Sequence, residues 1–242
     1  MFTSILIGLW AATSRVASSP LLPGPLAVAK TIAIALRDGT LGRAVLTSVV
    51  RLALGYGFSL VFGVLLGVAL ARSQKTRAAI GPLILGMSSV PSICWLPLAI
   101  LWFGLSEWAI QTVIVLGALL PIAVATEAAV KHVPPQLVRA ARTMGARGPR
   151  LLFGVIIPAA FPGILSGAKL GWTFALRSLM AGELLFVSGG LGQLLETGRD
   201  IGDTALVVAI IVTIIALGRA SEWALFGRLD REVGRRWGTE AA

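Results

Sequence analysis

The chain has 242 residues, of which 56% are hydrophobic and only 13% are charged. This composition excludes a soluble globular enzyme and indicates a polytopic membrane protein, because apolar runs of about twenty residues match the roughly 30 Å hydrocarbon core of a bilayer. The formal net charge of +10 also occurs in nucleic-acid-binding proteins, so the distribution of the basic residues along the chain decides between the two classes.

Six apolar segments are predicted to cross the bilayer. The first, over residues 1–16, is short for a helix that rises about 1.5 Å per residue, and the alternative is a signal sequence. We favour a span, because no small-residue cleavage site followed by a soluble domain accompanies it. The other five predicted spans cover 44–71, 79–104, 108–130, 159–187 and 204–226. We therefore expect an all-α protein of about six transmembrane helices, with a single domain over 1–242 and its core over 44–226.

Prolines interrupt this pattern in two places. A group of three between residues 20 and 25 ends the first span, and the moderately amphipathic stretch 26–37 that follows is expected along the outer surface. Pro91 and Pro97 fall within the third predicted span, where each removes a backbone hydrogen bond and is expected to kink the helix. Such a kinked helix either packs against its neighbours or lines a permeation path.

The basic residues gather in alternate loops. With the N-terminus inside, the outer segments carry Arg15, Lys30, Arg37, Arg43 and Arg199. The inner segments carry the larger set, Arg72, Lys75, Arg77, Lys131, Arg139, Arg142, Arg147, Arg150, Arg228, Arg231, Arg235 and Arg236. An excess of Lys and Arg on one side marks the cytoplasmic face of a membrane protein. The charge therefore predicts cytoplasmic N- and C-termini, and we do not expect nucleic-acid binding.

Catalytic and metal-binding patterns are missing from the sequence. Cys94 is the single cysteine and lies in an apolar run, so we expect it to pack as a small hydrophobe. The single histidine, His132, has no Cys or His partner at metal-ligand spacing, and no phosphate-binding GxxxxGK[ST] pattern is present. We therefore predict no cofactor, no metal and no enzymatic activity, and any ATPase would be a separate chain.

The loop over 131–158 is predicted to lie in the cytoplasm. Pro134 and Pro135 favour a helix start, residues 136–144 can form about two turns, and Gly145 favours a stop. A second short helix is expected to lead from Pro149 to the membrane re-entry at Pro158.

Small and basic side chains lie together in the first of these short helices and in the residues that follow it. Ala140 and Ala141 offer little bulk, so a protein partner could approach the helix closely, and positive charge comes from Arg139, Arg142, Arg147 and Arg150. The alternative is an amphipathic helix that rests on anionic lipid headgroups. The residues by themselves leave both interpretations open.

The fifth predicted span has two distinct sides. Gly163, Gly167 and Gly171 form a GxxxGxxxG series, which favours close packing of a neighbouring helix. The opposite side carries Lys169, Thr173, Arg177 and Glu183. Because an ionisable group inside a span costs roughly 2.5–3.5 kcal/mol, this stripe is not expected to face lipid. It either lines a translocation pathway, or Lys169 reaches the interface while Arg177 and Glu183 form structural pairs.

The segment that begins at Arg139 reads RAARTMGARGPRLLFGVIIPAAFPGILSG, and it resembles the EAA loop of binding-protein-dependent ABC transporter permeases. The resemblance implies a coupling helix that docks into a cleft of a cytoplasmic ATPase, and it assigns this contact to Arg139, Ala140, Ala141, Gly145 and Pro158. In that family the first position is usually Glu, so a Glu-mediated contact is not expected here.

The resemblance covers most of the chain. The segments SVVRLALGYGFSLVFGVLLGVALARS, PLILGMSSVPSICWLPLAILWFG and MAGELLFVSGGLG are similar to the nitrate/sulfonate/taurine/bicarbonate-type permeases. The resemblance implies the type I ABC importer fold, a location in a prokaryotic inner membrane, and a pathway for a small anion. If the solute is a small anion, we expect Arg177 to be its transient partner. The implied partners are two ATPase subunits, a second permease subunit (identical or paralogous) and an extracytoplasmic solute-binding protein. The alternatives are a secondary carrier or channel without an ATPase, and a non-transporting scaffold.

Overall fold

The computed structural model describes residues 8–14, 22–185 and 189–237, and all regular structure in these ranges is helical. The prediction of an all-α protein is therefore confirmed. Of the first predicted span, residues 8–14 form a helix and the remainder lies outside the described residues.

Four helices in the described ranges are long and apolar enough to cross a membrane. They cover Thr40–Arg72 (α3), Glu107–Lys131 (α6), Gly148–Leu184 and Thr204–Arg235, the last within α11 (Thr204–Trp237). Each overlaps a predicted span. Three of them extend beyond it at both ends or at one end, because the helices continue into polar residues that an apolar run does not include, whereas the helix Gly148–Leu184 begins well before the predicted start at 159 and ends before 187. A fifth span is obtained if a bent helix pair is counted as one.

The third predicted span, 79–104, is wrong as a single kinked helix. The structure has α4 (Gln74–Ser88) and a pair of short helices, Ser92–Trp95 and α5 (Leu96–Phe103), with a bend of 104° between the two parts. The chain breaks before Pro91, because a proline disfavours helical backbone at the residue that precedes it. Pro97 lies in the first turn of α5, where its missing N–H has no intrahelical role, so it does not kink the helix.

The helix is continuous through Pro158, where re-entry into the membrane was predicted. The short α8 (Gly148–Leu151) continues through a π-helical turn, Leu152–Ile156, into α9 (Ile157–Leu184). The wider π turn changes the helical register just before Pro158, which then lies in the first turn of α9.

The chain forms two compact units. The first, unit 1, comprises Met1–Arg51 and Leu179–Ala220, and the second, unit 2, comprises Leu52–Ser178 and Ser221–Ala242. In unit 1, α2 (Pro25–Arg37) and α10 (Leu191–Asp200) pack with parts of the long helices. The buried core of unit 1 consists of Ala35, Leu41, Ala44, Leu191 and Ile210.

A hydrogen-bonded turn joins α2 to α3. The side chain and the backbone N–H of Thr40 both donate to the Asp38 carboxylate, at 2.6 and 2.9 Å. These hydrogen bonds, the side-chain one first, lower the pKa of Asp38 below its ordinary value. The amphipathic stretch predicted at 26–37 is thus a helix that ends in an ordered turn before the first long span.

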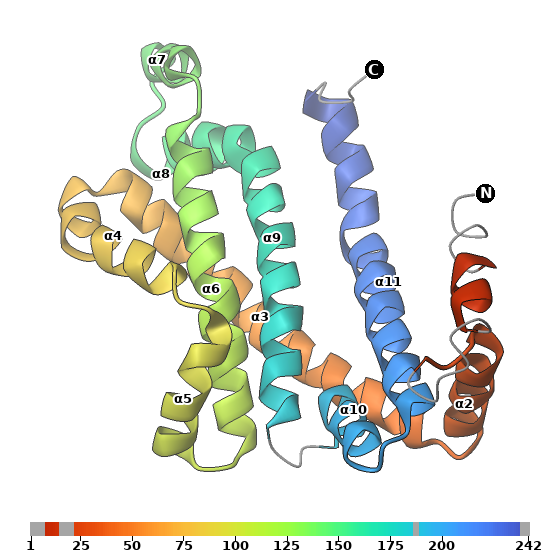
Figure 1. The fold of residues 1–242 in the computed structure, drawn as a ribbon. Coiled ribbons are helices and arrows are strands. Elements are labelled where there is room, and N and C mark those ends of the chain that lie inside the picture. The colour runs from red at the N-terminus through yellow and green to blue at the C-terminus, as the bar shows by residue number, and fades with distance from the viewer. Residues whose placement is uncertain (1–7, 15–21, 186–188, 238–242) are drawn as a thin grey trace. The chain divides into compact units, whose positions relative to one another are not determined.

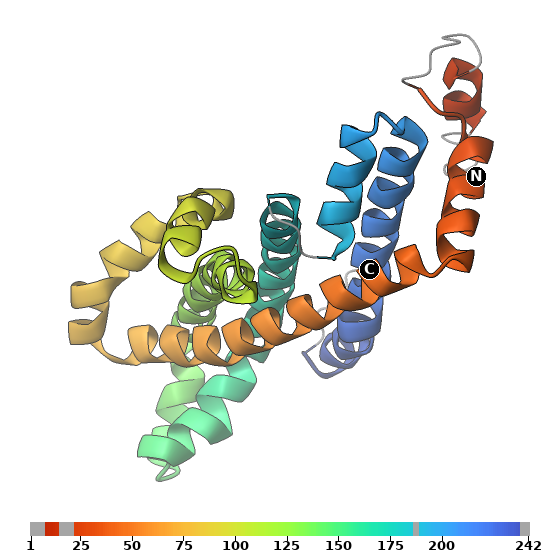
Figure 2. The same ribbon diagram turned by 90° about the horizontal axis from the view of Figure 1, so that it is seen from below.

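In unit 2, α6 is the central helix, with α5 and α9 beside it (Figure 1). α4 leaves the end of α3 and curves toward α5, as the view from below shows (Figure 2). The short helix α7 (Pro135–Thr143) lies beyond the C-terminal end of α6 (Figure 1). Several α6 side chains have no exposed surface at all, namely Ile110, Val113, Ile114, Ala118, Ile122 and Ala123.

Candidate functional site

The predicted coupling helix is α7, and a complete C-terminal cap closes it. Gly145 has a φ of 88°, a left-handed conformation that favours glycine. Its N–H donates to the carbonyl of Arg142 at 3.0 Å, and the N–H of Ala146 donates to the carbonyl of Ala141 at 2.9 Å. This pair of bonds is the Schellman arrangement. The sequence therefore predicted both ends of the helix to within one residue.

The two adjacent alanines of α7 have different environments. Ala140 and Arg139 are exposed, whereas Ala141 is buried, with 3% of its surface accessible. Only Ala140 is thus available to a partner, and Ala141 instead allows α7 to pack closely on its own loop. Pro158 lies in α9 rather than in α7.

The glycine series of α9 lies directly against α6. A Cβ atom placed on Gly163 would lie 2.7 Å from the Cβ of Ala129, and one on Gly167 would lie 2.6 Å from the Cβ of Ala125. At Gly171 the same atom would lie 2.4 Å from Ile122 Cγ1. Such distances are shorter than van der Waals contact, so the two backbones can approach this closely only with glycine at these positions.

The predicted polar stripe on the other side of α9 does not form one continuous surface. Lys169 makes an ion pair with Asp230 of α11, and Trp172 Nε1 donates to Ser221 Oγ of the same helix at 3.2 Å. The exposed Thr173 hydroxyl donates to the carbonyl of Lys169 at 3.3 Å. In unit 2, the contacts with Asp230 and Ser221 hold α9 to α11.

Arg177 lines a cavity of about 350 Å³ in unit 2. Its guanidinium carbon lies 5.8 Å from the centre of the Phe174 ring, which also lines the cavity. Three hydroxyl groups and an indole ring from the bend between α4 and α5 complete the polar part of the lining, namely Ser88, Ser89, Ser92 and Trp95. The cavity thus combines one positive charge with hydroxyl groups and aromatic surface.

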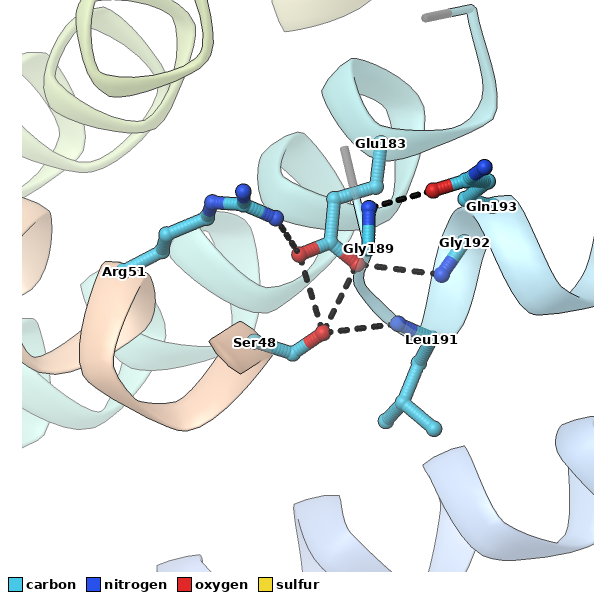
Figure 3. A network of polar contacts seen from close by, with 7 residues as sticks. All are labelled: Ser48, Arg51, Glu183, Gly189, Leu191, Gly192 and Gln193. Carbon is cyan, nitrogen blue, oxygen red and sulfur yellow. Dashed lines mark hydrogen bonds and ion pairs between the residues drawn. The ribbon is translucent and has the colours of Figure 1, made fainter. Parts of the chain in front are cut away.

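Glu183, the fourth residue of the stripe, is fully buried inside unit 1 (Figure 3). Its carboxylate lies 2.9 Å from Arg51 Nη1 and accepts hydrogen bonds from Ser48 Oγ at 2.9 and 2.8 Å. The pathway-lining role predicted for Glu183 does not fit this burial, and the alternative of a structural pair does. A buried charge is tolerated because an opposite charge and several hydrogen bonds replace the water that it loses.

The same network caps the N-terminus of α10 (Figure 3). The Gly192 N–H donates to Glu183 Oε2 at 3.0 Å, and the Leu191 N–H donates to Ser48 Oγ at 2.9 Å. The first amide groups of a helix have no intrahelical acceptor, and they attract negative charge. One carboxylate from α9 and one hydroxyl from α3 therefore hold the start of α10.

Gly190 and Gly192 lack side chains, and Glu183 occupies the space that such side chains would fill. A Cβ atom on Gly190 would lie 2.1 Å from Glu183 Oε1, and one on Gly192 would lie 2.5 Å from Glu183 Cβ. Neither residue has a positive φ, so close packing rather than backbone conformation requires glycine here. The segment GGLG thus fits around a buried carboxylate.

Sequence reasoning missed three residues of these contacts, namely Ser48, Arg51 and Asp230. A signal for Arg51 was present, because a lone arginine in an apolar run requires an anionic partner. Arg51 and Glu183 also lie toward the same end of their spans if the helices alternate in direction. Asp230 carried no comparable signal, because the end of α11 contains many charged residues.

The described residues contain no group of three or more His, Cys, Asp or Glu side chains placed to hold a metal ion. The polar contacts found here bind helices together, and the cavity beside Arg177 is the part of the predicted stripe that could receive a small solute.

Residues 59–233 match a family described as "Binding-protein-dependent transport system inner membrane component". Over 229 residues the chain is 31% identical to the taurine transport system permease protein TauC of Escherichia coli, covering 92% of this chain and 83% of that protein. It is 28% identical to the putative aliphatic sulfonates transport permease protein SsuC of Bacillus subtilis, over 92% of this chain and 81% of that protein.

A solved structure shares the fold. A chain of the MetNI methionine ABC transporter in an inward-facing conformation matches with a TM-score of 0.71 and 24% sequence identity, over 80% of this chain and 96% of that chain. At this level of identity the likeness establishes the arrangement of the helices only.

Proposed function

The chain belongs to the family of binding-protein-dependent transport system inner membrane components, and we propose that, as the permease subunit of an ABC importer, it forms a pathway for a small sulfonate or related anion. A second permease subunit, identical or paralogous, would complete the pathway. ATP would be hydrolysed by two separate ATPase subunits in the cytoplasm, and a solute-binding protein would deliver the solute from outside.

The observation that carries the coupling part of this proposal is the form of α7. This helix is short, it lies beyond the end of a long apolar helix, and a complete cap fixes its C-terminus. Its exposed surface includes Arg139, Ala140 and the nearby Met144, which is 81% exposed. A small residue beside an exposed apolar one suits insertion into a cleft of the ATPase. Closure of the ATPase dimer on ATP would then move α7 and shift the permease between inward and outward openings.

Crosslinking in membranes tests this contact. Cys94 is exposed and is first replaced by Ala, after which Ala140→Cys is combined with single cysteines in the cleft of the ATPase. We expect disulfide crosslinks whose yield changes when ATP is added. Glu196→Cys on α10 serves as the matched control and should not react with the ATPase. Absence of Ala140 crosslinks in vesicles that actively import solute would contradict the proposal.

The solute part of the proposal is supported by two independent observations. The relatives named for taurine and aliphatic sulfonates act on compounds that carry a sulfonate group. The 350 Å³ cavity beside Arg177 offers a guanidinium group, which matches the oxygen atoms of such an anion, and an aromatic surface for its carbon chain. Lys169 and Thr173 remain candidates for the pathway, although Lys169 is engaged by Asp230.

Uptake measurements with Arg177 variants test the assignment of the solute contact. Loss of a charged hydrogen bond costs about 1.5–3 kcal/mol, so we expect Arg177→Gln to lower uptake of a sulfonate by about tenfold or more. Arg177→Lys should retain more uptake because it keeps the charge. Binding of solutes to the purified solute-binding protein identifies the compound to use. Unchanged uptake by Arg177→Gln at equal expression would remove Arg177 from the pathway.

The proposed orientation places both termini and α7 in the cytoplasm of a prokaryotic cell. The basic residues near α7 and near the end of α11 support this orientation. Accessibility of single cysteines to a membrane-impermeant reagent tests it. The same vesicles test the competing function of a secondary carrier or channel, since import that continues with an inactive ATPase and stops with a protonophore would replace our proposal.

A further inference from the structure

A second cavity, of about 620 Å³, lies beside the loop between α7 and α8 in unit 2. Three arginines line it: Arg72, Arg142 and Arg147. The other side chains in its lining are aliphatic, namely those of Ala146, Leu151, Leu152 and Ile156. We call this site the arginine cavity, and the proposed function assigns it no role.

Among the described residues, the three arginines have no acidic partner. Within the described ranges none of them makes an ion pair or a side-chain hydrogen bond with another group of the chain. Glu127, the acidic residue near the C-terminus of α6, is already engaged by Arg77 at 3.0 Å and by Lys131. Three like charges around one cavity repel one another, so an anion that enters it gains their combined attraction.

The local sequence turns the chain so that these charges meet. Gly145 ends α7 with a φ of 88°, and Gly148 begins α8 with a φ of 54°. Both values lie in the left-handed region, which side chains other than glycine rarely adopt. Two such residues within four positions reverse the backbone sharply, and Arg142 and Arg147 then line the same cavity as the last residue of α3, Arg72.

The cavity lies at the ends of two long helices. The apolar helix α3 ends at Arg72, and the apolar helix Gly148–Leu184 begins beside the cavity. The arginine cavity is therefore on the side of unit 2 that carries α7, which the distribution of basic residues predicts to be the cytoplasmic side. Basic pockets between helix ends on the cytoplasmic side are suited to phosphate-containing headgroups.

We propose that the arginine cavity is a binding site for a phosphate group, and that the phosphate belongs to an anionic phospholipid of the same leaflet. The planar guanidinium groups match pairs of phosphate oxygens, and an arginine holds its charge at any physiological pH. Ile156 and the accessible edges of the mostly buried Leu151 and Leu152 form an apolar side of the cavity that the glycerol part of a lipid can contact. The bound phosphate connects the loop after α7 to the end of α3, and so holds the coupling helix α7 in position.

Lipid binding to the intact complex of permease and ATPase tests this site. The complex is exchanged into phosphatidylcholine nanodiscs, and phosphatidylglycerol is titrated in while bound lipid is counted by native mass spectrometry. We expect saturable binding to the wild type and at least tenfold weaker binding when Arg72, Arg142 and Arg147 are all replaced by Gln. Arg150→Gln is the matched control, because Arg150 belongs to the same loop and does not line the cavity.

A second arm identifies the source of the phosphate group. Failure of millimolar inorganic phosphate to displace phosphatidylglycerol supports the lipid, whereas displacement shows that the site takes soluble phosphate and overturns the lipid assignment. Equal binding by the wild type and the triple variant overturns the site itself, as does an equal loss in Arg150→Gln.

Two further measurements keep this result interpretable. Size-exclusion profiles confirm that the complex is assembled, and if the triple variant fails to assemble, the single variants Arg72→Gln and Arg147→Gln are measured in its place, each with an expected loss of about threefold or more. The readout is lipid binding rather than import, so a failure of the proposed solute or coupling role leaves this test unaffected.

Discussion

Arginine side chains have opposite environments in the two units. In unit 1, Arg51 is buried against the carboxylate of Glu183, and this pair belongs to a hydrogen-bonded network that also holds the start of α10. In unit 2, Arg72, Arg142 and Arg147 are exposed and line a cavity, and no acidic side chain in the described part of the chain pairs with them. The first arrangement is complete within the chain. The second leaves its charges available to an anion from outside the chain.

The difference separates structural charge from charge available for binding. A buried ion pair contributes little net stability compared with an apolar pair of the same size, but loss of one partner is costly because the other remains away from water. An exposed arginine keeps its hydration, so its removal has little effect on folding. Stability and ligand binding should therefore respond to substitutions in opposite ways at the two sites.

The largest effect is expected from Glu183→Ala. This change removes the acceptor of Arg51, Ser48 and the Gly192 N–H together, and we expect a loss of about 3–5 kcal/mol in the free energy of unfolding. Unfolding by SDS in mixed micelles measures it. The double variant Arg51→Met with Glu183→Met should recover part of the loss. If Glu183→Ala unfolds like the wild type, the network does not exist as described.

Gly190→Ala tests the packing around the same carboxylate. Its Cβ would lie 2.1 Å from Glu183 Oε1, and the buried carboxylate has no free space to move into, so we expect a loss of about 1–3 kcal/mol. Gly42→Ala in α3 is the control, because its Cβ would have no neighbour within 4 Å. The control should be neutral or slightly stabilising, and equal losses in both variants would contradict the steric explanation.

Gly145→Ala tests the loop that builds the arginine cavity and closes α7. Left-handed backbone costs an L residue about 1–2 kcal/mol, although a Cβ at this position would meet no neighbour within 4 Å. We expect ATP hydrolysis to continue while import falls, because the C-terminal end of α7 and the loop that positions this helix are altered. Gly154→Ala in the following π turn has neither a positive φ nor a close neighbour and should import normally. Normal import by both variants would count against α7 as the coupling helix.

The smallest effect on stability is expected from Arg72→Gln. We expect a change within about 0.5 kcal/mol in the free energy of unfolding, because the side chain is exposed and unpaired. The same measurement on Arg51→Gln should give a loss several times larger. A large loss in Arg72→Gln would show that this arginine has a structural role and would remove the contrast between the two units.

Features that depend on neighbours in the sequence were predicted well. The two prolines before α7 and the glycine after it determine both ends of that helix, because capping acts within a few residues. The long spans were also found, since their apolar runs exceed the thickness of the bilayer. The glycine series of α9 indicated close packing, although only the structure identified α6 as the helix that packs there.

The kink predicted at Pro91 is a complete break between α4 and α5, and the size of the bend was not predicted. Composition shows that residues 79–104 are apolar, but it does not distinguish a kinked span from two helices at 104°. Proline permits either outcome, and packing against α6 selects between them. The polar stripe of α9 failed as a single surface for a similar reason, because periodicity places side chains on one face of a helix without specifying which helices cover that face.

The sequence alone determined the class of the protein, the positions of its long helices and the short capped helix α7, since hydropathy and capping are local properties. The tertiary structure alone decided that Glu183 pairs with Arg51 and caps the start of α10, that Lys169 pairs with Asp230, and that three arginines line one cavity. The partners in these contacts come from helices far apart in the chain, and only the packing of those helices brings their charges within reach of one another.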